Sequence, residues 1–297
     1  MAWFLMGLLC FSITGTLTDA ECHCNTTTTC AVFPSTPCSQ VSVPDRCQEG
    51  WFGSYCQRQN IALGRTATQN STYNEWTQRF EAWYAVDGRT TNLFNSKPPT
   101  CSHTLKSGGV QTWTVNLNNS YTDKIQHVKL YLRQDYPERN RGMEIYVGGQ
   151  FCFQLSTNTN PPAIADVRCH QALTGNNLTI QTNDFLALCE VQIFVCSDGW
   201  FGEDCDKQCH CSPKTEICDK ITGQCQRGCA PGYMKPDCQT ACPNGYYGNC
   251  IPKCGNCLNA AYCDKATGIC PGSCEAGWLT DTCLQREYML LPQIANV

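Results

Sequence analysis

Apolar and polar residues alternate in several short runs through the middle of this chain. The runs are Trp113–Leu117, Val128–Leu132, Met143–Val147, Leu178–Ile180 and Leu188–Val195. An alternation of period two places apolar side chains on one face of a β-strand. Stretches rich in Gly, Asn and Pro separate the runs, which predicts an all-β sandwich or barrel over residues 57–195. A segment of this length buries a proper hydrophobic core.

The cysteines divide the chain in a second way. Of 27 cysteines in 297 residues, seven precede residue 57, sixteen lie from Cys196 onward, and four lie between. Two cysteine-dense, loop-rich ends therefore flank a middle part that depends mainly on its core.

The first 20 residues indicate the compartment. The apolar run Trp3–Ile13 is too short to span a bilayer, and small residues up to Ala20 follow it, which predicts a signal peptide cleaved near Ala20. Cleavage removes Cys10 and leaves 26 cysteines, and an even, dense set in a secreted chain indicates disulfides. Four Asn-X-Ser/Thr sequons are candidate glycosylation sites: Asn25, Asn70, Asn118 and Asn177.

Charge and motif content argue against several function classes. The formal net charge is −4 and no cluster of Lys and Arg occurs, which argues against nucleic acid or an anionic membrane as partner. No later segment approaches the roughly 20 apolar residues of a membrane-spanning helix. No metalloprotease, nucleophile-elbow or phosphate-loop motif is present, so we expect no enzymatic activity. The chain is expected to be secreted and extracellular.

The C-terminal cysteines recur with a fixed period. Cys196, Cys218 and Cys238 have counterparts 45 or 46 residues further on, and Gly-aromatic turns such as Gly199-Trp200 recur with them. A period of this size indicates an array of small modules. The spacing Cys254-Gly-Asn-Cys257 leaves zinc as an alternative, which the oxidising compartment disfavours.

These repeats, and a six-cysteine version before residue 57, resemble the laminin-type EGF-like module of the multiple-EGF-like and scavenger-receptor families. No convincing calcium-binding EGF signature precedes them. The resemblance implies these pairings in the first module and the first repeat: Cys22–Cys30, Cys24–Cys38, Cys47–Cys56, Cys196–Cys205, Cys209–Cys218, Cys211–Cys225 and Cys229–Cys238. For the second repeat it implies Cys242–Cys250, Cys254–Cys263, Cys257–Cys270 and Cys274–Cys283.

The middle part resembles a different family. Five segments carry the resemblance in order: Asn60–Gln69, Ala85–Gly88, Thr100–His103, Trp113–Leu117 and Leu188–Val191. Together they resemble the F-type lectins, the fucose-binding fucolectin and tachylectin-4 group. The resemblance implies a jelly-roll β-sandwich of the galactose-binding-like superfamily, with Cys101–Cys189 and Cys152–Cys169 as its bridges.

The F-type lectins bind fucose with a histidine, an Arg-X-Asp motif and a second arginine. This pattern maps onto His103, Arg133, Asp135 and Arg139. Arginine donates several fixed hydrogen bonds and suits a neutral sugar rich in oxygen. Asp135 is expected to support the arginines, and Phe94 to contact the methyl group of the sugar.

Tyr136 stands where many members of this family have a disulfide between adjacent cysteines, and its ring is a candidate platform for the sugar. The spacing between His103 and Arg133 and that between Asp135 and Arg139 also depart slightly from the family pattern. These departures leave open a degenerate site that no longer binds sugar.

The same family holds a structural calcium ion beside its sugar loops. Asp87 and Glu190 match its two acidic ligands. The resemblance assigns backbone carbonyl ligands to Tyr84, Arg89, Thr100 and Cys189. Calcium accepts six to eight oxygen ligands in irregular geometry, so such a set suits it.

The predicted organisation is a signal peptide (1–20), an EGF-like module (21–56), the lectin-like sandwich (57–195), two EGF-like repeats (196–240 and 241–285) and a C-terminal tail (286–297). The expected function is recognition of fucosylated glycans or glycoproteins by a secreted, calcium-containing lectin that gains strength from multiple copies. The alternative is a scavenger-type interaction protein, or the ectodomain of a receptor, in which the modules bind protein partners and the sugar site is degenerate.

Overall fold

The computed structural model describes residues 23–24, 47–94, 97–106, 108–118, 124–236, 238–258 and 262–287. The predicted signal peptide, the predicted partners Cys22, Cys30 and Cys38, the sequon at Asn25 and the last ten residues lie outside this range. Within the described range the chain is all-β, apart from two short 3-10 helices, η2 (Ala82–Val86) and η3 (Pro137–Asn140). No helix there is long and apolar enough to cross a membrane.

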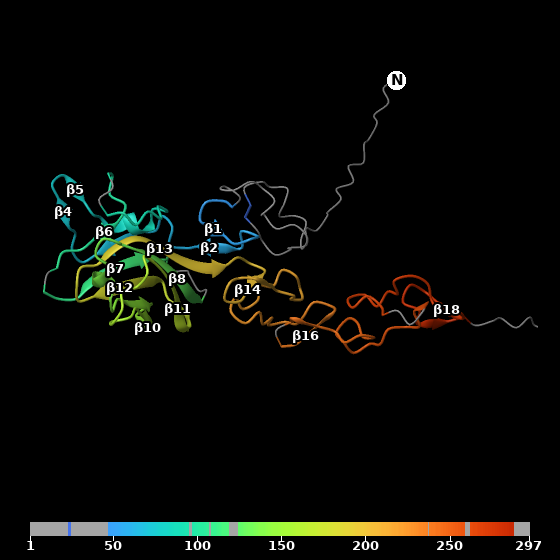
Figure 1. The fold of residues 1–297 in the computed structure, drawn as a ribbon. Helices are drawn as coiled ribbons and strands as arrows, with labels where there is room; N and C mark the ends of the chain where they lie inside the picture. The colour runs from blue at the N-terminus through green and yellow to red at the C-terminus, as the bar shows by residue number, and fades with distance from the viewer. Residues whose placement is uncertain are drawn as a thin grey trace, which may run out of the picture.

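Two antiparallel sheets form the sandwich of the middle part (Figure 1). The first has the order β1-β2-β13-β8-β11, with β6 also paired to β13. Its strands are β1 (Trp51–Phe52), β2 (Arg58–Asn60), β6 (Ser102–His103), β8 (Ile125–Leu132), β11 (Ile164–Leu173) and β13 (Ala187–Cys196). The second has the order β10-β9-β12-β7-β3. Its strands are β3 (Ala67–Gln69), β7 (Gln111–Asn116), β9 (Glu144–Val147), β10 (Gln150–Gln154) and β12 (Asn177–Thr182).

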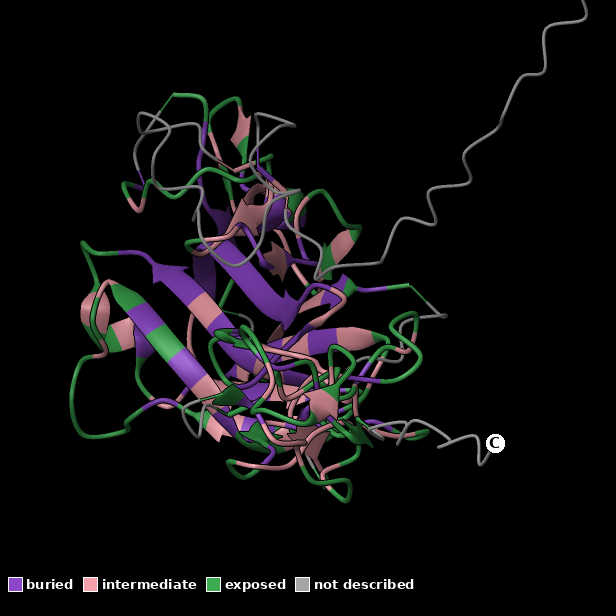
Figure 2. Cartoon of the chain, turned by 90° about the vertical axis from the view of Figure 1, so that its right-hand side faces the viewer, coloured by how far each residue is buried: buried purple, intermediate pink, exposed green. Residues whose placement is uncertain are grey.

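The core lies between the two sheets and is built from the alternating apolar residues. Trp113 and Val115 of β7, Ile145 of β9 and Leu130 of β8 all have no exposed surface. The strand β13 departs from the alternation, because all ten of its residues are buried (Figure 2). Helix η2 packs on this strand, so β13 is covered on both faces.

The modules repeat one small hairpin. The hairpin pairs are β14 (Trp200–Phe201) with β15 (Lys207–Gln208), β16 (Tyr233–Met234) with β17 (Thr240–Ala241), and β18 (Trp278–Leu279) with β19 (Gln285–Arg286). A further hairpin, β4 (Asn74–Glu75) with β5 (Gln78–Arg79), projects from the sandwich. In Figure 1 the repeats extend in a line away from the sandwich.

Disulfides and aromatic rings replace a conventional core in the modules. Phe201 packs with Cys211, Cys218 and other cysteines of its module, and its ring leaves no room for a side chain at Gly223, where a Cβ would lie 2.5 Å away. The structure pairs the same cysteines that the EGF-like resemblance implies for Cys47–Cys56 and for all eight bridges from Cys196 onward. Bridges therefore occupy the cysteines for which zinc was the alternative.

The sandwich and its flanking modules share backbone pairing. β2 pairs with β1 of the first module on one side and with β13 on the other. Cys196, the last residue of β13, forms the first bridge of the next module, and the ring of Trp200 stacks on Tyr55 with centroids 5.2 Å apart. The boundary predicted near residue 195 falls inside β13, and the one near residue 56 falls in the turn between the paired strands β1 and β2.

Candidate functional site

The first sheet brings the three predicted sugar-binding side chains to one end of the sandwich. Both β6 and β8 pair with β13, in a register that places His103 opposite Ala187 and Leu132 opposite Leu188. Arg133 directly follows Leu132, and η3 with Arg139 follows a few residues later. His103 and Arg133 therefore meet across the start of β13.

Arg133 is held in one orientation. Its Nε and Nη2 donate to the two carboxylate oxygens of Asp135, each at 2.6 Å. The guanidinium carbon lies 3.6 Å from the ring centroid of Phe94 and 4.6 Å from that of Tyr136. Bidentate pairing and stacking on aromatic faces both suit the planar guanidinium, and both restrict its rotation. Arg133 is only 7% exposed, so the cluster presents a preset edge of N–H donors.

Arg139 joins the same cluster through the rings of Tyr136 and Phe185. Its guanidinium carbon lies 4.1 Å from the ring centroid of Tyr136 and 4.5 Å from that of Phe185. Tyr136 therefore contacts both guanidinium groups. The two cations are kept close by Asp135 and by the negative faces of aromatic rings, which reduces their mutual repulsion.

His103 forms the buried wall of the cluster. Its ring centroid lies 5.0 Å from that of Tyr73, 5.2 Å from Phe94 and 5.6 Å from Phe185. Nδ1 donates to the carbonyl of Thr104 at 2.6 Å, which leaves Nε2 as the nitrogen that can face a ligand. Burial lowers the pKa of His103 to about 4, and the charges of Arg133 and Arg139 add to this effect.

A neutral His103 predicts sugar binding that does not change between about pH 5.5 and pH 8, because the pKa of about 4 lies below this range. Titration with L-fucose at several pH values measures this pH dependence, and a midpoint near the ordinary histidine pKa of about 6.5 would contradict the assignment.

The depressed pKa of His103 also affects the stability of the protein in a defined direction. The pKa of His103 is lower in the folded than in the unfolded protein. The neutral ring's contribution to the free energy of unfolding is therefore fully present above about pH 6.5, and it is lost as the pH falls toward about 4. Comparison with a His103→Gln variant isolates it.

The aromatic residues of the cluster differ in how far they face solvent. Phe94 is 5% exposed, with Arg133 near its ring and Phe80 stacked on it at 4.5 Å, so it supports the arginine more than it faces solvent. Phe185, which sequence reasoning missed, is half-buried and contacts both His103 and Arg139. Its one signal in the sequence is its place three residues before the Leu188–Val191 motif.

The two acidic side chains predicted as calcium ligands, Asp87 and Glu190, lie near each other beside η2. Asp87 caps η2, and Glu190 lies fully buried on β13. The backbone N–H of Gly88 donates to one carboxylate oxygen of Glu190 at 3.2 Å. Asp87 Oδ2 and Glu190 Oε1 are buried without a hydrogen-bond partner. Burial, with Asp87 nearby, raises the pKa of Glu190 to about 9.

The other predicted calcium ligands lie close in sequence to Asp87 or Glu190, apart from Thr100. Tyr84 lies within η2, and Arg89 and Thr100 lie in the loops that follow it. The ladder between β8 and β13 has a bulge between Leu188 and Glu190, which takes Cys189 out of regular pairing. Within the described range no group of three or more His, Cys, Asp or Glu side chains is placed to hold a metal. Arg89 Nε lies 3.7 Å from Asp87 Oδ2 as an ion pair, whereas Glu190 Oε1 has neither a hydrogen bond nor an ion pair among the described residues. A buried carboxylate oxygen next to irregular backbone fits a cation that takes carbonyl ligands.

The two bridges of the sandwich pair as the resemblance implies. Cys101–Cys189 links the loop before β6 to β13, and Cys152–Cys169 links β10 to β11. Since Cys101 directly precedes β6, the first bridge ties the acidic pair to the strand that carries His103.

The three described sequons lie in different settings. Asn118 is exposed, and Asn177 is partly buried at the start of β12. The Asn70 amide nitrogen donates to the carbonyl of Val110 at 3.0 Å, and its oxygen accepts from the N–H of Thr112 at 3.1 Å. Glycosylation at Asn70 therefore has to preserve or replace these two bonds.

Comparison with known proteins gives partial likenesses. No protein-family model matches the chain. A segment of 45 residues is 51% identical to Dendrite extension defective protein 1 of Caenorhabditis elegans, which covers 15% of this chain and 4% of that protein. The chain thus spans only a small fraction of that relative's length.

Several of the similar solved structures are fucose-binding lectins or modules, and others are chitosan-binding modules. A fucolectin from the serum of striped bass, Morone saxatilis, is 26% identical over 46% of this chain and 48% of that chain, with a TM-score of 0.40. The lectin domain of lectinolysin, solved with Lewis B antigen, is 25% identical over 46% of this chain and 96% of its own, with a TM-score of 0.39. A fucose-binding module of Streptococcus pneumoniae is 23% identical over 48% of this chain and 98% of its own, also with a TM-score of 0.39.

Proposed function

We propose that this chain is a secreted carbohydrate-binding protein whose β-sandwich recognises a fucose-type deoxyhexose on glycans or glycoproteins. The observation that carries the proposal is the convergence of His103, Arg133 and Arg139 on one set of aromatic rings, Phe94, Tyr136 and Phe185. The sequence motifs that resemble F-type lectins supply the sugar class.

The chemistry of the cluster suits a neutral sugar. The guanidinium edges donate hydrogen bonds to hydroxyl and ring oxygens, and His103 Nε2 accepts one from a hydroxyl group. Half of the charge of the arginine pair is already balanced by Asp135, so the site does not need an anionic ligand. Tyr136 is 42% exposed and offers an aromatic face to the C–H groups of the sugar.

Asp87 and Glu190 are the residues that would hold a calcium ion, together with carbonyls from the flanking loops. The ion would supply positive charge to two buried carboxylates. The support is the buried Glu190 Oε1, which accepts no hydrogen bond, and the nearby Asp87 Oδ2, which has only the 3.7 Å ion pair with Arg89. This ion is structural in the proposal, and the sugar contacts are made by side chains.

The modules would serve as spacers and as surfaces for protein partners. Several apolar side chains of the repeats are well exposed, including Ile217 at 55%, Ile251 at 74% and Tyr262 at 62%. A protein partner at a cell or microbial surface that covers these side chains would remove apolar surface from water. Assembly of several copies would turn one weak sugar site into useful binding strength.

Retention on fucose resin tests the proposal. The full chain in millimolar calcium is expected to bind immobilised L-fucose at high density and to be released by free L-fucose. D-galactose serves as the control competitor, because it carries a C6 hydroxyl and differs in configuration. A chain that passes through the resin unretarded, or that both sugars release equally, would reject the proposed specificity.

A further inference from the structure

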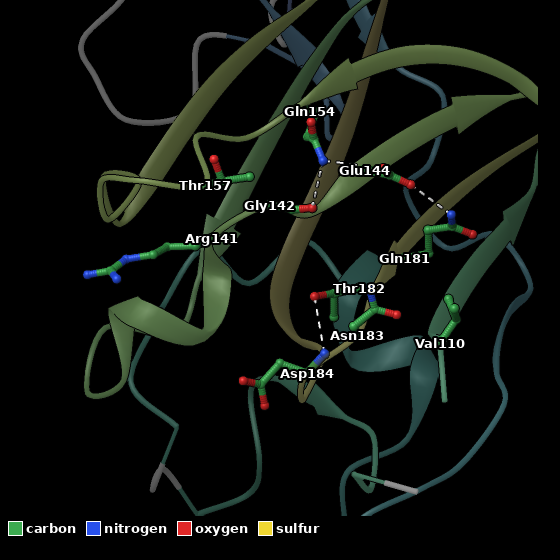
Figure 3. Close-up of a pocket in the computed structure, with 10 residues that line it drawn as sticks. All are labelled: Val110, Arg141, Gly142, Glu144, Gln154, Thr157, Gln181, Thr182, Asn183 and Asp184. Atoms are coloured by element: carbon green, nitrogen blue, oxygen red, sulfur yellow. Dashed lines mark hydrogen bonds between the residues drawn. The ribbon is translucent and has the colours of Figure 1, made fainter. Parts of the chain in front are cut away.

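A polar pocket lies next to the proposed fucose site and takes no part in it. It has a volume of about 360 Å³, at the small end of the range of about 300–1,000 Å³ for ligand pockets. Its lining comes from the ends of three strands of the second sheet and from the loops beside them (Figure 3). The residues that carry the argument are Glu144, Gln154, Gln181, Asn183 and Asp184.

Glu144 is fixed by three neutral donors. Gln181 Nε2 and the Tyr146 hydroxyl each donate to Oε2 at 2.8 Å, and Gln154 Nε2 donates to Oε1 at 3.3 Å. The strand register places the three partners side by side, since Glu144 lies opposite Gln154 on β10 and opposite Gln181 on β12. The carboxylate raises the pKa of Tyr146, so this hydroxyl stays a donor. The network orients acceptor oxygens before any ligand arrives.

The other charged groups of the pocket are already paired at its edge. Asp184 accepts an ion pair from Lys106 at 3.2 Å. Arg141 donates to Asn160 at 2.6 Å, and in Figure 3 its side chain points away from the other lining residues. A bound anion would face Glu144 without a directed cation, so the pocket suits a neutral ligand. Vicinal hydroxyl groups, which both donate and accept, match a carboxylate flanked by amides and threonine hydroxyls.

The pocket and the proposed fucose site are formed in part by the same two segments of the chain. Asp184 lines the pocket, and the next residue, Phe185, contacts His103 and Arg139. Arg139 belongs to the fucose site, and Arg141, two residues later, lines the pocket. The two sites therefore use neighbouring residues of the same two segments and lie next to each other.

We propose that this pocket is a second carbohydrate-binding site, which receives an uncharged hexose or N-acetylhexosamine residue through Glu144, Gln181 and Gln154. It acts beside the proposed fucose site and does not require that site to be active. Val110 is the one large apolar residue among the lining residues, so binding depends on hydrogen bonds and is weak for a single sugar. Two adjacent weak sites favour branched or clustered glycans.

Saturation-transfer NMR on the full chain separates the two sites. The probes are free D-galactose, N-acetyl-D-glucosamine and L-fucose. In an Arg133→Ala/Arg139→Ala double variant, the L-fucose signal is expected to vanish, whereas the signal of at least one of the other two sugars persists. Addition of Glu144→Gln and Gln181→Ala is expected to reduce that persistent signal about tenfold or more, because a charged acceptor and a donor are lost together.

Asn183→Trp and Gln150→Ala complete the test. Asn183 is an exposed lining residue outside the Glu144 network, so a large ring there fills the pocket while the network stays intact. It is expected to remove the same signal, which covers the case in which the Glu144 variant misfolds. Gln150→Ala on the same strand as Gln154 is the matched control and is expected to change nothing. The proposal is overturned if galactose and N-acetylglucosamine give no signal, or if the pocket variants leave their signals unchanged. Failure of L-fucose alone would reject only the first site.

Discussion

Replacement of Arg133 by alanine is expected to abolish fucose binding, with a loss of about a hundredfold or more in affinity. Arg133 is the most constrained donor of the cluster, because Asp135 holds two of its nitrogens and Phe94 lies against its face. Each hydrogen bond from a charged group contributes about 1.5–3 kcal/mol, and every 1.4 kcal/mol is tenfold in affinity. The variant also leaves the carboxylate of Asp135 facing the sugar without its cation. Titration calorimetry or retention on fucose resin measures the loss.

Three companion variants make this result specific. Arg133→Lys keeps the charge but loses the planar fork, and is expected to stay severely impaired. The double variant Arg133→Ala/Asp135→Asn also removes the unpaired carboxylate charge. If it binds fucose again, the loss in Arg133→Ala came from that charge and not from the missing hydrogen-bond donors. Arg79→Ala removes an exposed arginine that pairs only locally with Glu81, and is expected to bind like the wild type. Wild-type affinity in a folded Arg133→Ala protein would refute the proposed site.

The alternating runs predicted the strands that alternate most strongly. The runs around Trp113, Leu130, Ile145 and Ile180 fall in β7, β8, β9 and β12. The strand β11 was not among them, although its burial alternates, because its inward residues include Ala165 and Cys169, which weaken an apolar pattern. The local sequence therefore indicates a strand only where large apolar residues mark one face.

The alternation of apolar and polar residues did not predict that the outer face of β13 is buried. Glu190 and Gln192 look like solvent-facing positions in the sequence, yet both are buried. The cause is tertiary, since η2 and its loops cover this face of the strand. The buried pair of Glu190 with Asp87 joins residues about one hundred positions apart, and no local rule predicts it.

The motif resemblance predicted which residues lie together in the candidate site, but it did not predict how they pack. The structure brings His103, Arg133, Asp135 and Arg139 together, which no spacing rule imposes. Phe185 joins them only because β13 starts between β6 and β8. The bidentate pair of Arg133 with Asp135 is local and follows from the Arg-X-Asp motif. What remained unpredicted in the site is contact between distant segments.

Removal of calcium is expected to lower the stability of the sandwich and its affinity for fucose together. Without a cation, the buried Glu190 takes up a proton, since burial and Asp87 raise its pKa to about 9. A bound ion lets both carboxylates stay charged, and an ion at tenfold excess over its dissociation constant adds about 1.4 kcal/mol to the free energy of unfolding. Thermal denaturation in EDTA and in millimolar calcium measures the change, with a lower melting temperature expected in EDTA.

Glu190→Gln distinguishes a metal site from a general effect of chelation. The amide fills the same space and still accepts the N–H of Gly88 through its oxygen, but it removes the charge that draws a cation. The melting temperature of this variant is expected to be the same with and without calcium, whereas Glu275→Gln, an exposed acid in the last module, keeps the wild-type response. The loss should reach the sugar, because Cys189 is bridged to Cys101, two residues before His103. If the melting temperature and the fucose affinity of the wild type are the same with and without calcium, Asp87 and Glu190 hold no calcium ion.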